Sequence, residues 1–127
     1  MRRVGFFLVF ICAACAGAMV HSTESGRYQD VTVSLTVPDL AWKIKIEEIY
    51  QVGETLLVIS TLSRADTHAA QAIQIVSDSV RIKAPAYKIR HYIMGKKWKW
   101  QNKESYIFIN SKEELSGELA GGVRLYP

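Results

Sequence analysis

The segment that most constrains the fold spans residues 42–62, two strand-like runs on either side of a turn. In the first run apolar and charged residues alternate from Trp42 to Glu47, the two-residue period of a half-buried strand. Residues 51–54, centred on Gly53, allow the chain to reverse. The second run, residues 56–59, is apolar on both faces, which is typical of a strand inside a sheet. The segment therefore predicts a β-hairpin at the centre of the core.

Alternation of the same kind predicts the other strands, which are bounded by proline, glycine and polar turn residues. They lie at residues 31–37, 72–84, 87–94, 105–109 and 123–126, and residues 96–100 are a candidate extension of 87–94. The run at 72–84 changes parity, because Ile73 and Ile75 fall on one face of an ideal strand whereas Val80 and Ile82 fall on the other. We therefore expect a β-bulge or a turn near residues 77–79.

One short helix is predicted near the C-terminal end. Ser111 and Glu114 have the spacing of a capping box, and Leu115 and Leu119 lie four positions apart on one helical face. About seven short strands with a single helix indicate an all-β domain, either a small two-sheet sandwich of the immunoglobulin-like kind or a barrel. The expected core consists of Trp42, Ile44, Ile46, Leu57, Ile59, Ile82, Ile89 and Phe108.

The N-terminal residues have the order of a secretory signal peptide: two arginines, an apolar run at residues 4–11, and then small residues. The apolar run is shorter than the roughly 20 residues needed to span a bilayer. We expect a signal peptide at residues 1–18, a polar flexible lead-in at 19–30 and a single β domain at 31–127. The mature protein is expected to be secreted or periplasmic.

Both cysteines, Cys12 and Cys15, lie in this leader, and two ways of processing it remain open. Residues 16–18 satisfy the small-x-small rule for signal peptidase, and cleavage there leaves a mature chain without cysteine. Residues 13–15 resemble the lipobox of bacterial lipoproteins, with Cys12 where leucine is usual, and Cys15 would then carry a lipid anchor. In neither case do the two cysteines form a structural disulfide.

The charge balance gives no general argument for a nucleic-acid partner. The chain of 127 residues has 16 Lys and Arg against 12 Asp and Glu, a net charge of +4, and removal of residues 1–18 with two arginines lowers it to +2. Proteins that bind nucleic acids concentrate a stronger basic excess on one face. We therefore expect a partner of another kind.

Local motifs for catalysis, cofactors or metals are missing from the sequence, which has no Gly-x-Ser-x-Gly, no His-Glu-x-x-His and no glycine-rich phosphate loop. His21 lies in the lead-in, His68 in a loop and His91 on a strand face, and none has a second metal ligand at a useful spacing. Glu47 and Glu48 point to opposite faces of a strand. We expect no metal and no cofactor, and an enzyme would need a site assembled from distant residues.

The densest aromatic and basic cluster lies at residues 96–103, with four lysines and two tryptophans. If this segment is extended, Trp98 and Trp100 share one face and Lys97 and Lys99 share the other. Flat indole rings beside ammonium groups are suited to stacking on sugar rings or to contact with an anionic polymer. In the simpler interpretation both indoles face the core and the lysines line an exposed sheet edge. The candidate binding residues are Lys96, Lys97, Trp98, Lys99, Trp100 and Lys103.

These features favour a non-catalytic binding or interaction module of the cell envelope or extracellular space. Its expected partner is an unknown protein or an anionic glycan, and membrane contact is expected only through a lipid on Cys15. If the tryptophan cluster is not the binding surface, the small and polar loop at residues 63–71 is the next candidate.

In length and expected architecture the chain is similar to the chagasin-like inhibitors of cysteine proteases, which are small exported immunoglobulin-type domains. Gly121–Gly122 resembles their glycine-rich loop, whereas their Asn-Pro-Thr-Thr-Gly loop and Arg-Pro-Trp segment are missing here. No residue role is transferred from that family, because similar architecture does not imply similar function. A protease-inhibitor-like domain is the alternative function, and an enzyme with a non-local site is the second alternative.

Overall fold

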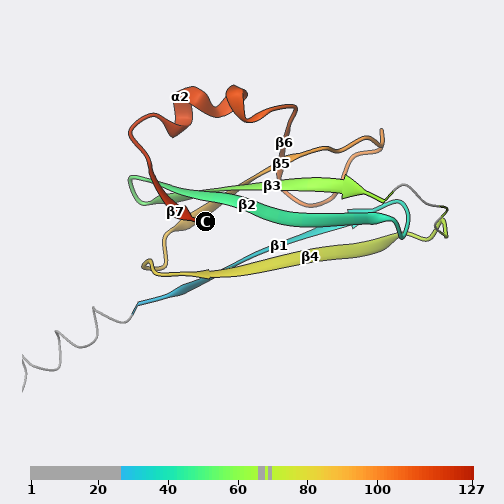
Figure 1. Ribbon diagram of the computed structural model, residues 1–127, viewed down its shortest axis with the longest axis horizontal. Helices are drawn as coiled ribbons and strands as arrows, with labels where there is room; N and C mark the ends of the chain where they lie inside the picture. The colour runs from blue at the N-terminus through green and yellow to red at the C-terminus, as the bar shows by residue number, and fades with distance from the viewer. Residues whose placement is uncertain (1–26, 66–67, 69) are drawn as a thin grey trace, which may run out of the picture.

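The computed structural model describes residues 27–65, 68 and 70–127. The predicted leader with Cys15, most of the predicted lead-in and part of the 63–71 loop lie outside these residues. The described chain forms seven strands and, before the last strand, one short helical segment (Figure 1). The elements are β1 (Gln29–Val37), β2 (Trp42–Val52), β3 (Thr55–Arg64), β4 (Gln74–Ile82), β5 (Lys88–Met94), β6 (Ile107–Ile109), η2 (Lys112–Leu115), α2 (Ser116–Leu119) and β7 (Val123–Tyr126).

These elements form three layers (Figure 1). Strands β1 and β4 make a two-stranded antiparallel sheet, and the other five strands make a second sheet in the order β6-β5-β3-β2-β7. The helical segment covers the far face of the larger sheet, where Leu115 packs with Leu57 and Ile59. The predicted small β-sandwich with one short C-terminal helix is confirmed, and the two sheets do not close into a barrel.

The predicted hairpin of β2 and β3 is at the centre of this structure. The two strands pair in antiparallel fashion around the turn at Gly53, and β3 is the middle strand of the larger sheet. Leu56 and Val58 face the smaller sheet, while Leu57 and Ile59 face the helical layer. Both faces of β3 are therefore buried, as its unbroken apolar run predicts.

The predicted core is confirmed for most of its members. Six residues are buried, namely Trp42, Ile44, Ile46, Leu57, Ile59 and Ile82. Ile89 and Phe108 are partly buried and pack against the cluster between the two sheets. That cluster also contains the four inward-facing residues of β1, which are Val31, Val33, Leu35 and Val37.

The predicted break near residues 77–79 is wrong. Strand β4 pairs with β1 along its whole length without a shift in register. The strand stays regular because one of the two apolar sets faces solvent: Ile73 is 72% exposed and Ile75 is 67% exposed. Asp78 takes the position turned toward the larger sheet, and its Oδ2 accepts a hydrogen bond from the Ile46 N–H at 2.8 Å. That contact lies beside an irregularity in β2, where the register of β2 against β3 shifts after Ile46.

The order of strands in the larger sheet differs from their order in the sequence. Strand β5 pairs in parallel with β3 on one side and with β6 on the other. Residues 95–106, which connect β5 to β6, have no regular secondary structure, so the candidate extension at 96–100 is not a strand. The predicted capping box at Ser111 and Glu114 is present. In the part of the chain that the structure describes, no helix is long and apolar enough to cross a membrane.

Candidate binding site

The irregular segment at residues 95–106 begins at a glycine that the packing requires. Gly95 has a φ of +97°, and a Cβ built on it would lie 2.5 Å from the carbonyl oxygen of Leu62. A side chain at this position would therefore clash with the backbone of β3, and the positive φ would strain the backbone of the substituted residue. The chain can pass this close to β3 and then cross toward the smaller sheet.

Side chains of the segment cover the outer edge of β1. Glu104 Oε2 accepts hydrogen bonds from the Thr36 N–H at 2.9 Å and from the Thr36 hydroxyl at 2.8 Å. Asn102 donates to the Thr36 carbonyl at 2.8 Å, and the Tyr106 hydroxyl accepts from the Ser34 N–H at 3.2 Å. These side chains satisfy backbone groups that a further strand would otherwise pair. The segment is thereby fixed along β1.

The two tryptophans of the cluster have different environments. Trp98 is half-buried, with its ring edge-on to Trp42 at 5.1 Å between centroids, and its Nε1–H donates to Asn102 Oδ1 at 2.9 Å. Trp100 lies 5.5 Å from the Trp98 ring and is 40% exposed. Trp98 therefore packs against the core, whereas Trp100 is at the surface.

The four lysines also divide into two groups. Lys96 donates a hydrogen bond to the Trp100 carbonyl at 2.9 Å, and its Nζ lies 4.8 Å from the centroid of the Phe108 ring. Lys96 thus supports the turn that presents Trp100. Lys97, Lys99 and Lys103 are exposed. In the described part of the chain none of these three ammonium groups takes part in an ion pair.

A groove of about 600 Å³ lies between Trp100 and the start of β4, and we name it the Trp100 groove. Its lining residues are Thr36, Ile73, Gln74, Ile75, Trp100, Gln101 and Lys103. The walls combine an indole, two isoleucines, two amides, a hydroxyl and an ammonium group. Sequence reasoning identified Trp100 and Lys103 but not the β4 wall. The change of parity at Ile73 and Ile75 was the available signal, because it means that one apolar pair must face solvent.

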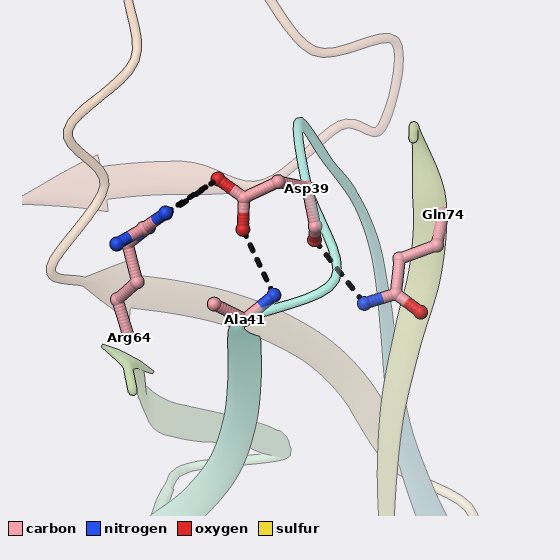
Figure 2. Close-up of polar contacts among 4 residues, drawn as sticks. All are labelled: Asp39, Ala41, Arg64 and Gln74. Carbon is pink, nitrogen blue, oxygen red and sulfur yellow. Dashed lines mark hydrogen bonds and ion pairs between the residues drawn. The ribbon is translucent and has the colours of Figure 1, made fainter. Parts of the chain in front are cut away.

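A polar corner at Asp39 fixes the β4 wall of the groove (Figure 2). The Asp39 carboxylate pairs with Arg64 at 3.2 Å and accepts a hydrogen bond from the Ala41 N–H at 2.9 Å. The Asp39 carbonyl accepts from Gln74 Nε2 at 3.2 Å. The corner therefore joins the β1–β2 turn to the end of β3 and to the first residue of β4. It holds the Gln74 side chain in one position at the groove.

His91 and the nearby Ser60 do not form an accessible catalytic pair in the part of the chain that the structure describes. His91 lies on β5 with its ring 4.7 Å from that of Tyr106, and burial lowers its pKa below the ordinary value of 6.5. Its Nδ1 has no hydrogen-bond partner among the described residues. Ser60, on the neighbouring strand β3, is fully buried, so its hydroxyl cannot meet a substrate. Within residues 27–65, 68 and 70–127 no group of His, Cys, Asp and Glu is arranged to hold a metal ion.

In the glycine pair that resembles an inhibitor loop, Gly122 has a packing role. Gly121 and Gly122 connect α2 to β7, and a Cβ on Gly122 would lie 2.9 Å from a methyl carbon of Val52. Close approach of the turn to β2 thus accounts for glycine at this position.

Comparisons with known proteins assign no family to the chain. No protein-family model matches it, and no curated protein or solved structure matches it.

Proposed function

We propose that this chain is an exported, non-catalytic binding domain that recognises an anionic polysaccharide at the Trp100 groove. The observation that carries the proposal is an exposed indole in a groove whose other walls carry amide and hydroxyl groups. The C–H faces of sugar rings pack against flat aromatic rings, and sugar hydroxyls exchange hydrogen bonds with amides. A concave site with apolar walls and a few polar groups is typical of ligand binding.

Three exposed lysines favour an anionic ligand over a neutral one. Lys103 lines the groove, while Lys97 and Lys99 are exposed in the same segment as Trp100. Carboxylate or sulfate groups on a sugar chain would gain attraction from these charges. Exposed charges are screened over about 10 Å at moderate salt, so this contribution is expected to depend on ionic strength. Sugar stacking on Trp100 is expected to depend on it much less.

The first prediction is that Trp100→Ala weakens binding to heparin by about 1 kcal/mol, roughly fivefold, because the stacking surface is lost. The urea midpoint of unfolding should stay within experimental error of the parent value, since Trp100 lies outside the core. Replacing Lys97 and Lys99 with alanine should instead reduce the salt dependence of binding. Isothermal titration calorimetry at two salt concentrations measures both effects.

The matched control replaces Lys43 and Lys45 with alanine. These exposed lysines of β2 alternate with core residues and lie on the side of the larger sheet that carries the helical layer. Heparin affinity should not respond to their removal beyond the small change in net charge. The proposal fails if Trp100→Ala binds heparin as the parent does, or if polyglutamate binds as tightly as heparin, because charge alone would then explain binding.

The second prediction concerns export, which the signal-like leader supports. Cleavage after the small residues at 16–18 is the expected route, and residues 20–22 are a candidate later site, so the intact mass of the mature protein should equal that of a bare chain starting at Met19 or, for the later site, at Thr23. A mass that starts at Cys15 and exceeds the peptide mass by a lipid would contradict soluble export. In that case Cys15→Ala should release the protein from membranes.

A further inference from the structure

The outer face of the two-stranded sheet carries short hydroxyl side chains in cross-strand pairs. Because the odd-numbered residues of β1 from Val31 to Val37 are buried, the even-numbered ones point outward. The hydroxyl oxygens of Thr32 and Ser79 lie 2.9 Å apart, and those of Ser34 and Ser77 also lie 2.9 Å apart. These residues are small, so a long ligand can approach the sheet closely along this line. We name this surface the hydroxyl face.

Each hydroxyl pair keeps hydrogen-bonding capacity for a ligand. A hydroxyl has one donor hydrogen and two acceptor lone pairs, and only one of the two hydrogens is used within a pair. The other hydrogen can therefore be donated outward, and lone pairs remain to accept hydrogen bonds. Thr32, Ser77 and Ser79 are exposed, and Ser34 is half-buried. Such alternating donors and acceptors match the hydroxyl groups of a sugar chain.

Each end of the hydroxyl face has an aromatic ring and a cation. At one end Thr36 lines the Trp100 groove together with Lys103. At the other end Tyr28 is 54% exposed, and the guanidinium carbon of Arg81 lies 5.3 Å from the centroid of its ring. Asp30 is also at this end, 3.9 Å from Arg81 and equally exposed, and its carboxylate offsets part of the positive charge.

We infer that an anionic polysaccharide lies along the whole hydroxyl face, from Trp100 to Tyr28, as an extended chain. This inference rests on the proposed function and specifies the length of its ligand. Tyr28 and Thr36 are eight positions apart, and a strand rises about 3.4 Å per residue, so the face is about 27 Å long. Fragments shorter than this can occupy only one of the two aromatic ends.

The test measures the affinity of size-fractionated heparin fragments for the parent protein and two variants. For the parent, affinity should rise with fragment length and level off at about 27 Å. Trp100→Ala should weaken binding of short and long fragments alike, about fivefold. Tyr28→Ala should weaken only the long fragments, about fivefold, and bring them close to the affinity of short ones. Val123→Ala, at an exposed apolar residue of the distant strand β7, is the matched control and should change neither.

A second variant tests the same inference through charge. Asp30→Asn removes the carboxylate beside Arg81, so it should strengthen binding of long fragments without affecting short ones. If Trp100→Ala weakens binding but Tyr28→Ala and Asp30→Asn change no fragment, the inference is overturned and the proposed function stands. If Trp100→Ala has no effect at any length, both are overturned.

Discussion

At the residue scale, Trp98 and Trp100 have different roles although they are two positions apart. Trp98 is held by Trp42 and Asn102, whereas Trp100 lies against the outer side of Trp98 and faces the groove. The sequence predicted that the two indoles would share one side of the chain, and their rings are indeed 5.5 Å apart. It could not predict which one is exposed, because that depends on where residues 95–106 cross β1.

His91 is expected to make stability depend on pH. Burial lowers the pKa of His91, so the unfolded chain binds a proton that the folded chain does not when the pH falls below the ordinary value of about 6.5. The free energy of unfolding should therefore decrease as the pH falls below about 7.5, and the full contribution of His91 should be present above that pH. Urea denaturation at several pH values measures this decrease.

Replacing His91 with leucine is the control for this third prediction. His91→Leu removes the proton but keeps an apolar side chain against Tyr106, so its free energy of unfolding should change less over the same range. Two carboxylates have a lowered pKa and titrate at lower pH than His91. The hydrogen bond from Lys112 is the main cause of the lowered pKa of Glu48. For Glu104, burial raises the pKa, but hydrogen bonds that include those from Thr36 and Asn102 together lower it by more. Their stabilising contributions are lost only as the pH falls below about 4.5. An equal slope in parent and variant would contradict the role of His91.

At the scale of elements, strand β4 shows where prediction from alternating apolar and polar residues fails. Its two apolar sets have opposite parity, and the sequence alone suggested a bulge between them. In the structure the strand is regular, and Ile73 and Ile75 are exposed at the Trp100 groove. The error came from assuming that every apolar side chain faces the core. The residues that broke the pattern are the ones that line the candidate site.

The segment at residues 95–106, which covers the edge of β1, is the element that presents Trp100. The fourth prediction concerns the contacts that hold this cover in place. Glu104→Ala would leave the N–H and the hydroxyl of Thr36 without their acceptor, which should lower the free energy of unfolding by about 1–3 kcal/mol. An uncovered strand edge also promotes association between chains. Urea denaturation measures the first effect and light scattering measures the second.

Glu47→Ala is the control for this variant. Glu47 is an exposed carboxylate of β2, and substitutions at such surface positions usually change stability by less than about 0.5 kcal/mol. If Glu104→Ala is no more destabilising than Glu47→Ala, the contacts between Glu104 and Thr36 do not hold the cover in place.

At the scale of the whole molecule, the residues that the structure describes leave the outer face of the smaller sheet uncovered. The larger sheet lies between the helical segment and the smaller sheet (Figure 1). The outer face of β1 and β4 carries the hydroxyl pairs and adjoins the Trp100 groove. The domain therefore has its proposed binding surface on the side opposite the helical layer.

The sequence predicted much of this architecture but little of the site's assembly. Strand positions, the central β3 and the capped helix follow from local patterns between near neighbours. The parallel pairing of β5 with β3 and the meeting of Trp100 with Ile75 join residues far apart in the chain, and alternation contains no information about such pairs. Two of the seven residues that line the groove, Trp100 and Lys103, were therefore predicted from the cluster at 96–103, and the β4 wall was not.

The most direct test of the central claim is a two-dimensional NMR titration of the protein with heparin fragments, which follows each amide and indole N–H signal. The protein contains three tryptophans, so their indole signals can be compared within one spectrum. We predict that the indole of Trp100 and the amides of Ser34 and Ser77 shift together, while the indole of Trp42 and the amides of α2 do not. Shifts confined to α2 and the neighbouring face of the larger sheet, or no shift at Trp100, would contradict it.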